Sequence, residues 1–281
     1  MDWTPGGLSG DVEDRRSEGG GGFGIGGGGL GLGGLLILLV ISLITGRNFI
    51  GAFLFGNGAA THTAAPAAPP SANEQRSAQL VSFVLDDAQK TWTAILPNYR
   101  HAHLVLFRGA TYSGCGTARA ATGPFYCPRD EKVYIDLGFW NDLRRFGASG
   151  EFAQAYVIAH EIGHHVQKIV GTEQKVEQLR EENPSADNRL SVAMELQADC
   201  YAGIWAHSTE QRNIIDQADI RQGLQAAAAV GDDHLQKMSQ GYVAPDSFTH
   251  GSSQQRVTWF ERGLQSGDMR QCNTFGSRES E

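Results

Sequence analysis

A short apolar segment that carries three histidines and one glutamate constrains this fold more than any other part of the sequence. Residues 156–166 read YVIAHEIGHHV. His160 and His164 are four residues apart, so on an α-helix their side chains project from the same face. Buried polar groups need partners, and a divalent cation can be the partner of both imidazoles. The segment therefore predicts a buried metal-binding helix; the alternative is a histidine pair satisfied by protein groups alone.

The two remaining polar residues of this segment have different expected roles. Glu161 follows His160 in an HExxH pattern, which sets a carboxylate beside the metal without making it a ligand. Such a carboxylate can take a proton from a metal-bound water, so Glu161 is the predicted general base. His165 points about 100° away from His164 around the helix, and we expect it behind the ligands or in packing.

A catalytic zinc site needs a third protein ligand, because it keeps three such ligands and one open position. The metzincin continuation is absent, since Gln167 and Val170 stand where that class has glycine and histidine. Glu195 and Asp199 lie one helical turn apart in AMELQADCYAGIW, which is the ExxxD pattern. We expect Glu195 to bind the metal and Asp199 to accept a hydrogen bond from the far nitrogen of a ligating histidine. Taken alone, this pair would suit a solvated acidic helix face.

Four cysteines bear on the compartment of the protein. Cys115 and Cys127 flank a short loop whose closure by a disulfide would stabilise the fold by about 3 kcal/mol. A disulfide would suit an exported domain, whereas four buried thiols would suit a cytosolic one. The sequence leaves open whether Cys200 and Cys272 are paired.

The amino-terminal quarter differs in composition from the rest. Residues 1–29 are rich in glycine and are predicted to be a disordered tail. The apolar run at 30–44, continued to residue 55, predicts a single membrane-spanning anchor, although a helix across a bilayer needs about 20 apolar residues. A cleaved signal peptide is the alternative. Arg15 and Arg16 before the run and Arg47 after it set the orientation weakly, and we expect a cytoplasmic amino terminus and an extracytoplasmic catalytic domain.

Residues 56–74 are rich in alanine and proline and predict an extended linker, so that residues 75–275 would form the folded domain. Helical spacing of apolar residues occurs at 79–96, 152–170, 189–206, 214–229 and 254–264, and β-branched and aromatic residues predict strands at 103–107 and 132–137. The predicted fold class is α+β, mainly helical with a small sheet. We expect residues 132–137 to be an exposed edge strand on which a peptide substrate could lie.

The formal net charge of −8 and the absence of any run of lysine or arginine exclude nucleic acid as a partner. The expected partners are therefore a protein or peptide substrate and, through the apolar run, the lipid bilayer.

Four segments, namely HEIGHH, ELQADCYAGIW, CG...GPFYCPRDEKVYIDLGFW and THGSSQQR, together resemble the bacterial putative neutral zinc metallopeptidase family. The resemblance covers most of the chain. It implies a gluzincin-type zinc site, one amino-terminal transmembrane segment and a zinc-dependent hydrolase. THGSSQQR is similar to a segment in which a histidine stabilises the tetrahedral intermediate, which gives that role to His250, with Tyr242 behind it. The alternative for His250 is a surface loop ahead of a helix cap.

The expected function is therefore peptide-bond hydrolysis by water activated on Zn²⁺. Two alternatives remain open: a membrane-tethered binding module whose metal only joins helices, and a zinc amidase that acts on cell-wall peptides. Glu161 argues against the binding module, because a structural metal site has no use for a carboxylate at that position. The amidase shares the same chemistry.

Overall fold

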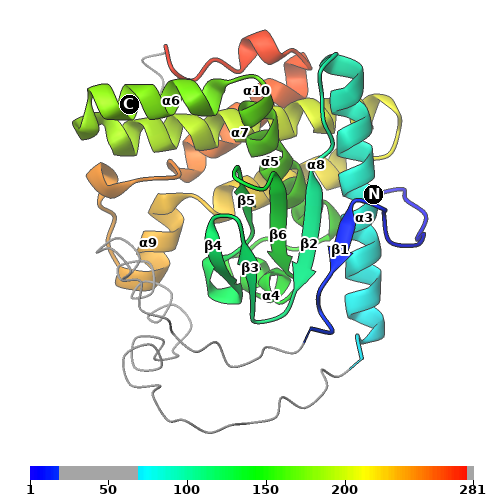
Figure 1. Cartoon of the computed structure of the whole chain (residues 1–281). Coiled ribbons are helices and arrows are strands. Elements are labelled where there is room, and N and C mark those ends of the chain that lie inside the picture. The colour runs from blue at the N-terminus through cyan, green and yellow to red at the C-terminus, as the bar shows by residue number, and fades with distance from the viewer. Residues whose placement is uncertain (19–68, 277–281) are drawn as a thin grey trace, which may run out of the picture.

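The computed structural model describes residues 1–18 and 69–276 of the chain. The described strands are β1 (Val12–Asp14), β2 (His103–Phe107), β3 (Ala110–Ser113), β4 (Gly116–Arg119), β5 (Phe125–Cys127) and β6 (Lys132–Asp136). The described α-helices are α3 (Ala72–Ile95), α4 (Phe139–Arg145), α5 (Glu151–Ile169), α6 (Thr172–Glu182), α7 (Asp187–Gln211), α8 (Gln217–Ala229), α9 (Asp232–Gln240) and α10 (Ser253–Ser266). The predicted α+β class, mainly helical with a small sheet, is confirmed (Figure 1).

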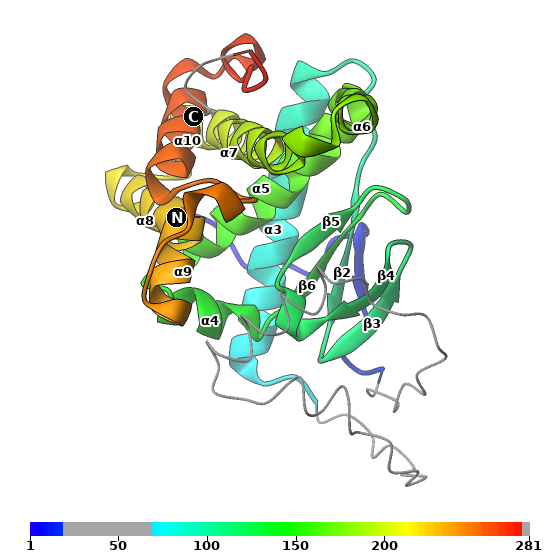
Figure 2. The same ribbon diagram turned by 90° about the vertical axis from the view of Figure 1, so that its left-hand side faces the viewer.

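The main sheet has the strand order β1-β2-β6-β5, and β3 and β4 form a separate antiparallel hairpin. Strand β2 is parallel to both of its neighbours, whereas β5 is antiparallel to β6. Alternate residues of a strand point to opposite faces. Leu104 and Leu106 join the core under the helices, while Val105 and Phe107 pack against the hairpin. Figure 2 shows this arrangement, with helices on one side of the sheet and the hairpin on the other.

The prediction that residues 132–137 form an exposed edge is wrong. Strand β6 covers most of this range, and it pairs with β2 on one side and β5 on the other. Its consecutive residues Val133, Tyr134 and Ile135 are all buried, which is typical of a strand covered on both faces. The edge of the sheet on this side is β5 instead.

The prediction of a disordered tail is wrong for the part of it that the structure describes. Residues 1–18 pack on the domain, and Val12, Glu13 and Asp14 pair with Leu104, Val105 and Leu106 as strand β1. Glycine is concentrated after this strand, since residues 19–34 contain 12 glycines and residues 1–18 contain three. The composition of the whole tail therefore concealed a short ordered segment. The folded domain therefore includes residues on both sides of the apolar run.

The predicted anchor at residues 30–55 lies outside the described residues. No helix in the described ranges is long and apolar enough to cross a bilayer. The predicted linker reaches too far, because α3 begins at Ala72. Ser71 caps this helix, and Glu74 completes a capping box by accepting the Ser71 backbone N–H.

Helices α5 and α7 pack closely because both present small groups at their crossing. A Cβ added to Gly163 of α5 would lie 2.8 Å from the Ala198 carbonyl oxygen of α7. Helix α7 approaches α10 in the same way, since a Cβ on Gly263 would lie 1.9 Å from the Cys200 carbonyl oxygen. Larger side chains would force these helices apart. The glycines therefore bring the polar residues of three helices within reach of one another.

The described residues contain two disulfide bonds. The predicted bond between Cys115 and Cys127 is present, and it links the loop after β3 to strand β5. Cys200 and Cys272, whose pairing the sequence left open, form the second bond. This second disulfide fastens the carboxyl-terminal segment to α7, one residue after Asp199.

Candidate active site

His160, His164 and Glu195 lie together, although they come from two helices. One ligand atom from each lies within 4.8 Å of the others. The Nε2 atom of His160 is 3.1 Å from one Glu195 oxygen, and the Nε2 atom of His164 is 3.4 Å from the other. Two imidazole nitrogens and a carboxylate oxygen are a donor set that fits Zn²⁺ with one position left open. Within the described ranges this is the one such group of three His, Cys, Asp or Glu side chains.

The far nitrogen of His160 is held by a buried polar network. Nδ1 of His160 lies 2.9 Å from Asp199, whose side chain is fully buried. Asp199 also accepts hydrogen bonds from the Tyr156 hydroxyl and from the Arg256 guanidinium, with Nε at 2.8 Å. These contacts place the His160 proton on Nδ1 and leave Nε2 for a metal. Asp199 thus lies where the sequence predicted it.

The far nitrogen of His164 has a neutral partner. Nδ1 of His164 lies 2.9 Å from the Oε1 atom of Gln167, which is itself fully buried. The amide of Gln167 donates to the Met194 carbonyl and to Gln197. Gln197 in turn donates to the carbonyl oxygen of Cys272. A chain of hydrogen bonds thus connects His164 with the segment that the second disulfide holds.

The charges of the site shift its pKa values strongly in the metal-free protein. Burial would lower the pKa of His160, but the charge of Asp199 and hydrogen bonds to Asp199 and Glu195 raise it to about 9. Burial opposes ionisation of Glu195, yet the nearby His164 and His160 hold its pKa well below the usual range. Burial likewise opposes ionisation of Asp199, and Arg256 and His160 lower its pKa. Without metal, His160 is therefore protonated near neutral pH.

Glu161 is buried beside His160, with 7% of its surface exposed. Burial raises the pKa of Glu161, although the neighbouring histidines oppose this effect. No described side chain forms a hydrogen bond with the Glu161 carboxylate, so its oxygens remain available to a water molecule. A raised pKa makes a carboxylate a stronger base toward such a water molecule.

His165 faces away from the three-residue group. Its Nδ1 atom lies 2.9 Å from the Tyr126 hydroxyl of β5, and its Nε2 atom lies 2.7 Å from the Arg100 carbonyl oxygen. The ring also packs edge-on against Tyr99. Burial lowers the pKa of His165, which keeps the imidazole neutral. This residue thus joins α5 to the edge strand β5. Of the two roles expected for His165, behind the ligands or in packing, the contacts correspond to packing.

His250 lies in the loop before α10 and is held by a carboxylate. Its Nδ1 atom is 3.1 Å from Asp232, which also accepts the backbone N–H groups of Thr249, His250 and Gly251. The His250 side chain is 51% exposed, and its hydrogen bond to Asp232 and the charge of Glu195 raise its pKa. The imidazole is thus within electrostatic reach of the three-residue group. Tyr242 is 64% exposed, and no described contact joins it to His250.

Sequence reasoning missed three of the residues that hold this site: Gln167, Asp232 and Arg256. Gln167 follows His164 by three residues, a helical spacing that brings the two side chains together. Arg256 is the last residue of the THGSSQQR segment. A single arginine in a sequence gives no indication that its side chain is almost completely buried. Asp232 contacts His250 from the start of α9, 18 residues earlier in the chain, so no local spacing marked it.

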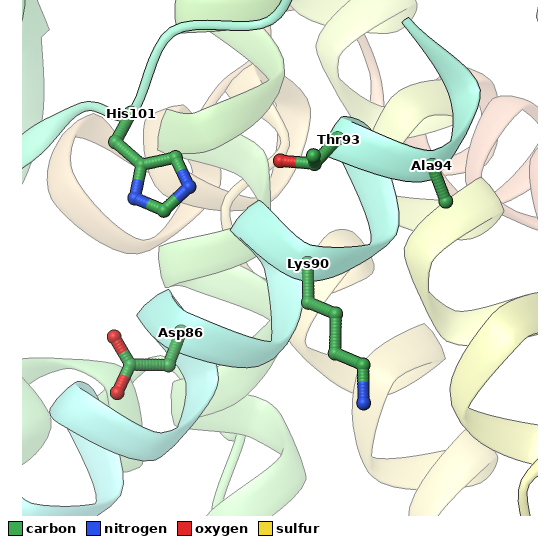
Figure 3. Close-up of a pocket in the computed structure, with 5 residues that line it drawn as sticks. All are labelled: Asp86, Lys90, Thr93, Ala94 and His101. Carbon is green, nitrogen blue, oxygen red and sulfur yellow. The ribbon is translucent and has the colours of Figure 1, made fainter.

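A separate hollow lies on the surface of α3. Figure 3 shows the residues that line it: Asp86, Lys90, Thr93 and Ala94 of α3, and His101 from the loop that follows. None of the residues that surround the three-residue group lines this hollow.

The fold and the site define a class: a mainly helical α+β protein in which an HExxH helix and an ExxxD helix bring two histidines and a glutamate together. The chain belongs to the family described as "Putative neutral zinc metallopeptidase", whose family model matches residues 1–275. The resemblance seen in the sequence is thus confirmed.

Relatives with similar sequences occur in distant bacteria. The chain is 48% identical to the uncharacterized protein YpfJ of Escherichia coli (strain K12) over 286 aligned residues, which covers 98% of this chain and 99% of that protein. It is 42% identical over 200 residues to an uncharacterized protein of Mycobacterium tuberculosis (strain H37Rv), covering 67% of each chain. No solved structure matches the chain.

Proposed function

We propose that this protein is a zinc-dependent metallopeptidase that hydrolyses peptide bonds. The observation that carries the proposal is Glu161, a buried carboxylate that adjoins the group formed by His160, His164 and Glu195. A site that only joined helices would close its fourth coordination position and would need no additional carboxylate there. Membership of the family supports the same assignment.

His160, His164 and Glu195 would hold the zinc ion. When bound, zinc would lower the pKa of a water molecule and polarise a substrate carbonyl group. Asp199 and Gln167 orient the two imidazoles by accepting hydrogen bonds from their Nδ1–H groups.

Glu161 would act as the general base and then as the general acid. Its carboxylate takes a proton from the attacking water and delivers that proton to the nitrogen of the leaving amine. The raised pKa of Glu161 suits the first step, because a stronger base accepts the proton more readily.

His250 would donate a hydrogen bond to the oxygen on which negative charge develops. Asp232 fixes the imidazole through Nδ1 and keeps its pKa raised, so Nε2–H can serve as the donor. A substitution of Asp232 should then slow the chemical step without removing the metal ligands.

A peptide substrate would lie extended along β5, which replaces residues 132–137 as the proposed edge strand. Strand β5 ends the described sheet, and Tyr126 on this strand is joined to α5 through His165. Main-chain pairing with an edge strand holds a peptide with little regard for its sequence.

We further propose an extracytoplasmic location and contact with the bilayer through the apolar residues 30–55. Two disulfides support the location, since such bonds persist in oxidising compartments. The length and apolarity of the run support the contact with lipid.

The test compares the wild type with Glu161→Gln, which keeps the size of the side chain and removes its basicity. Both proteins should bind one zinc ion per chain, measured by elemental analysis, and only the wild type should digest unfolded casein. Equal digestion by both proteins would refute the proposed role of Glu161. If both bind zinc and neither digests casein, synthetic cell-wall peptides assayed in parallel would distinguish an amidase from a binding module.

A further inference from the structure

The amino-terminal segment is held to the domain by contacts along most of its described length. The indole N–H of Trp3 donates to Glu151 at the start of the metal-binding helix α5, at 2.8 Å. Ser9 donates to Asp86 of α3 at 2.6 Å. Asp11 accepts a hydrogen bond from Gln89, also of α3, at 2.9 Å. These contacts reach two different helices, so the segment is part of the packed domain.

Strand β1 adds backbone hydrogen bonds to these contacts. It is parallel to β2, and Arg15 N–H donates to the Leu106 carbonyl oxygen at 2.8 Å. Glu13 also pairs with Lys132 at the start of β6. A parallel pair cannot be closed by a tight turn and needs a longer connection, of which the described part between β1 and β2 is α3 and the loop after it.

The described residues on the two sides of 19–68 are held together by Arg16. Arg16 is 1% exposed, pairs with Asp14 and donates to the Glu74 carbonyl oxygen in the first turn of α3. Figure 1 shows the end of β1 and the start of α3 at the same lower end of the domain. The arginine expected to lie in the cytoplasm is therefore buried in the domain.

From this geometry we infer that residues 1–18 lie on the same side of the membrane as the metal site. A single crossing within residues 19–68 would place β1 and β2 on opposite sides of the bilayer, which their pairing forbids. Two crossings would need about 40 apolar residues, and the run at 30–55 is too short for that. Contact between this run and the bilayer therefore begins and ends on one side, and the predicted single-pass topology is incompatible with the fold.

Site-directed labelling of the full chain tests the inference. Leu8 and Met238 are 40% and 46% exposed, and they lie in the amino-terminal segment and on α9. Leu8→Cys and Met238→Cys would each be treated with a membrane-impermeant maleimide in intact spheroplasts and after detergent lysis. The wild type is the background control, because all four of its cysteines are in disulfides.

Both variants should react alike, either before lysis or only after it. Reaction of both before lysis agrees with an extracytoplasmic domain, and reaction of both only after lysis would overturn that location while the inference stands. Reaction of one variant before lysis and of the other only after lysis would overturn the inference. None of these outcomes depends on peptidase activity.

Carbodiimide cross-linking tests the pairing of β1 directly. The reagent should join Glu13 to Lys132 by an amide bond in membranes that contain the full chain, and peptide mass spectrometry would detect the product. The Glu13→Gln variant should lose it. The Lys168–Glu173 pair, at 3.6 Å, is an internal control for the reagent. A product at Lys168–Glu173 without one at Glu13–Lys132 would show that β1 is not paired in the membrane-bound protein.

Discussion

Replacement of Arg256 by methionine should destabilise the domain strongly. Arg256 is 3% exposed and forms two hydrogen bonds with the fully buried Asp199. Methionine fills much of the same volume, so the main effect is to leave a buried carboxylate without its cation. Removal of one partner from a buried ion pair costs about 3–5 kcal/mol. This loss is a large part of the stability of a typical domain.

The expected loss depends on pH because His160 is a second partner of Asp199. In the metal-free protein the pKa of His160 is raised to about 9 from the usual 6.5, so its charge stabilises the fold fully below pH 6.5. That contribution is lost as pH rises through about 9. At pH 7 the protonated His160 still neutralises part of the Asp199 charge, so the loss of unfolding free energy in Arg256→Met should lie near the lower end of the range of about 3–5 kcal/mol. At pH 9.5 the cost should be larger.

Equilibrium unfolding of the metal-free protein in urea would measure these free energies, with an unchanged m-value as the test that only stability has changed. Arg100→Met is the matched control, because the Arg100–Glu131 pair is largely exposed and should contribute at most about 1 kcal/mol. Adding Asp199→Asn to Arg256→Met should recover part of the loss, since it removes the unpaired charge. A loss for Arg256→Met no greater than that for Arg100→Met would refute the reasoning.

Three further predictions concern the metal-binding group. Gln167→Met should weaken zinc binding by about 10–100-fold in a chelator competition, because His164 loses the acceptor that orients it, whereas the exposed Gln265→Met should leave affinity unchanged. Zinc binding at pH 7.5 should release a proton from His160, so the calorimetric heat should vary with the ionisation enthalpy of the buffer; a heat independent of the buffer would contradict the raised pKa. Gly163→Ala should lower the free energy of unfolding in urea by about 1–3 kcal/mol and weaken zinc binding, because the new methyl group would lie 2.8 Å from the Ala198 carbonyl oxygen. The control Gly10→Ala should change neither stability nor zinc affinity, since its methyl group would meet no atom within 4 Å.

The metal-binding residues could be predicted because each helix supplies them at a local spacing. His160 and His164 are four residues apart, as are Glu195 and Asp199. This spacing of about one helical turn can be recognised directly in the sequence. The convergence of the two helices is not local. It depends on the close approach of α5 and α7 at Gly163. Glycine usually destabilises a helix, but here its missing side chain is what allows the two helices to pack.

Strand β1 could not be predicted from its own residues. Val12, Glu13 and Asp14 are three residues with two charges, and they form a strand because β2 offers an edge about 90 residues later in the chain. The interior position of β6 did have a signal. Its adjacent residues Val133, Tyr134 and Ile135 do not alternate between apolar and polar, which indicates a strand covered on both faces.

The two histidines of the site are chemically unequal, because Asp199 is an anion and Gln167 is neutral. A carboxylate that accepts the Nδ1 proton makes the opposite nitrogen more basic, so His160 should be the stronger ligand. The same basicity makes His160 the stronger competitor for protons, as its pKa of about 9 indicates. Arg256 moderates this effect, since its charge lowers the pKa of His160 while it holds Asp199 ionised. The Arg256–Asp199 pair therefore balances ligand strength against proton binding, and removal of either residue should shift metal binding to a different pH range.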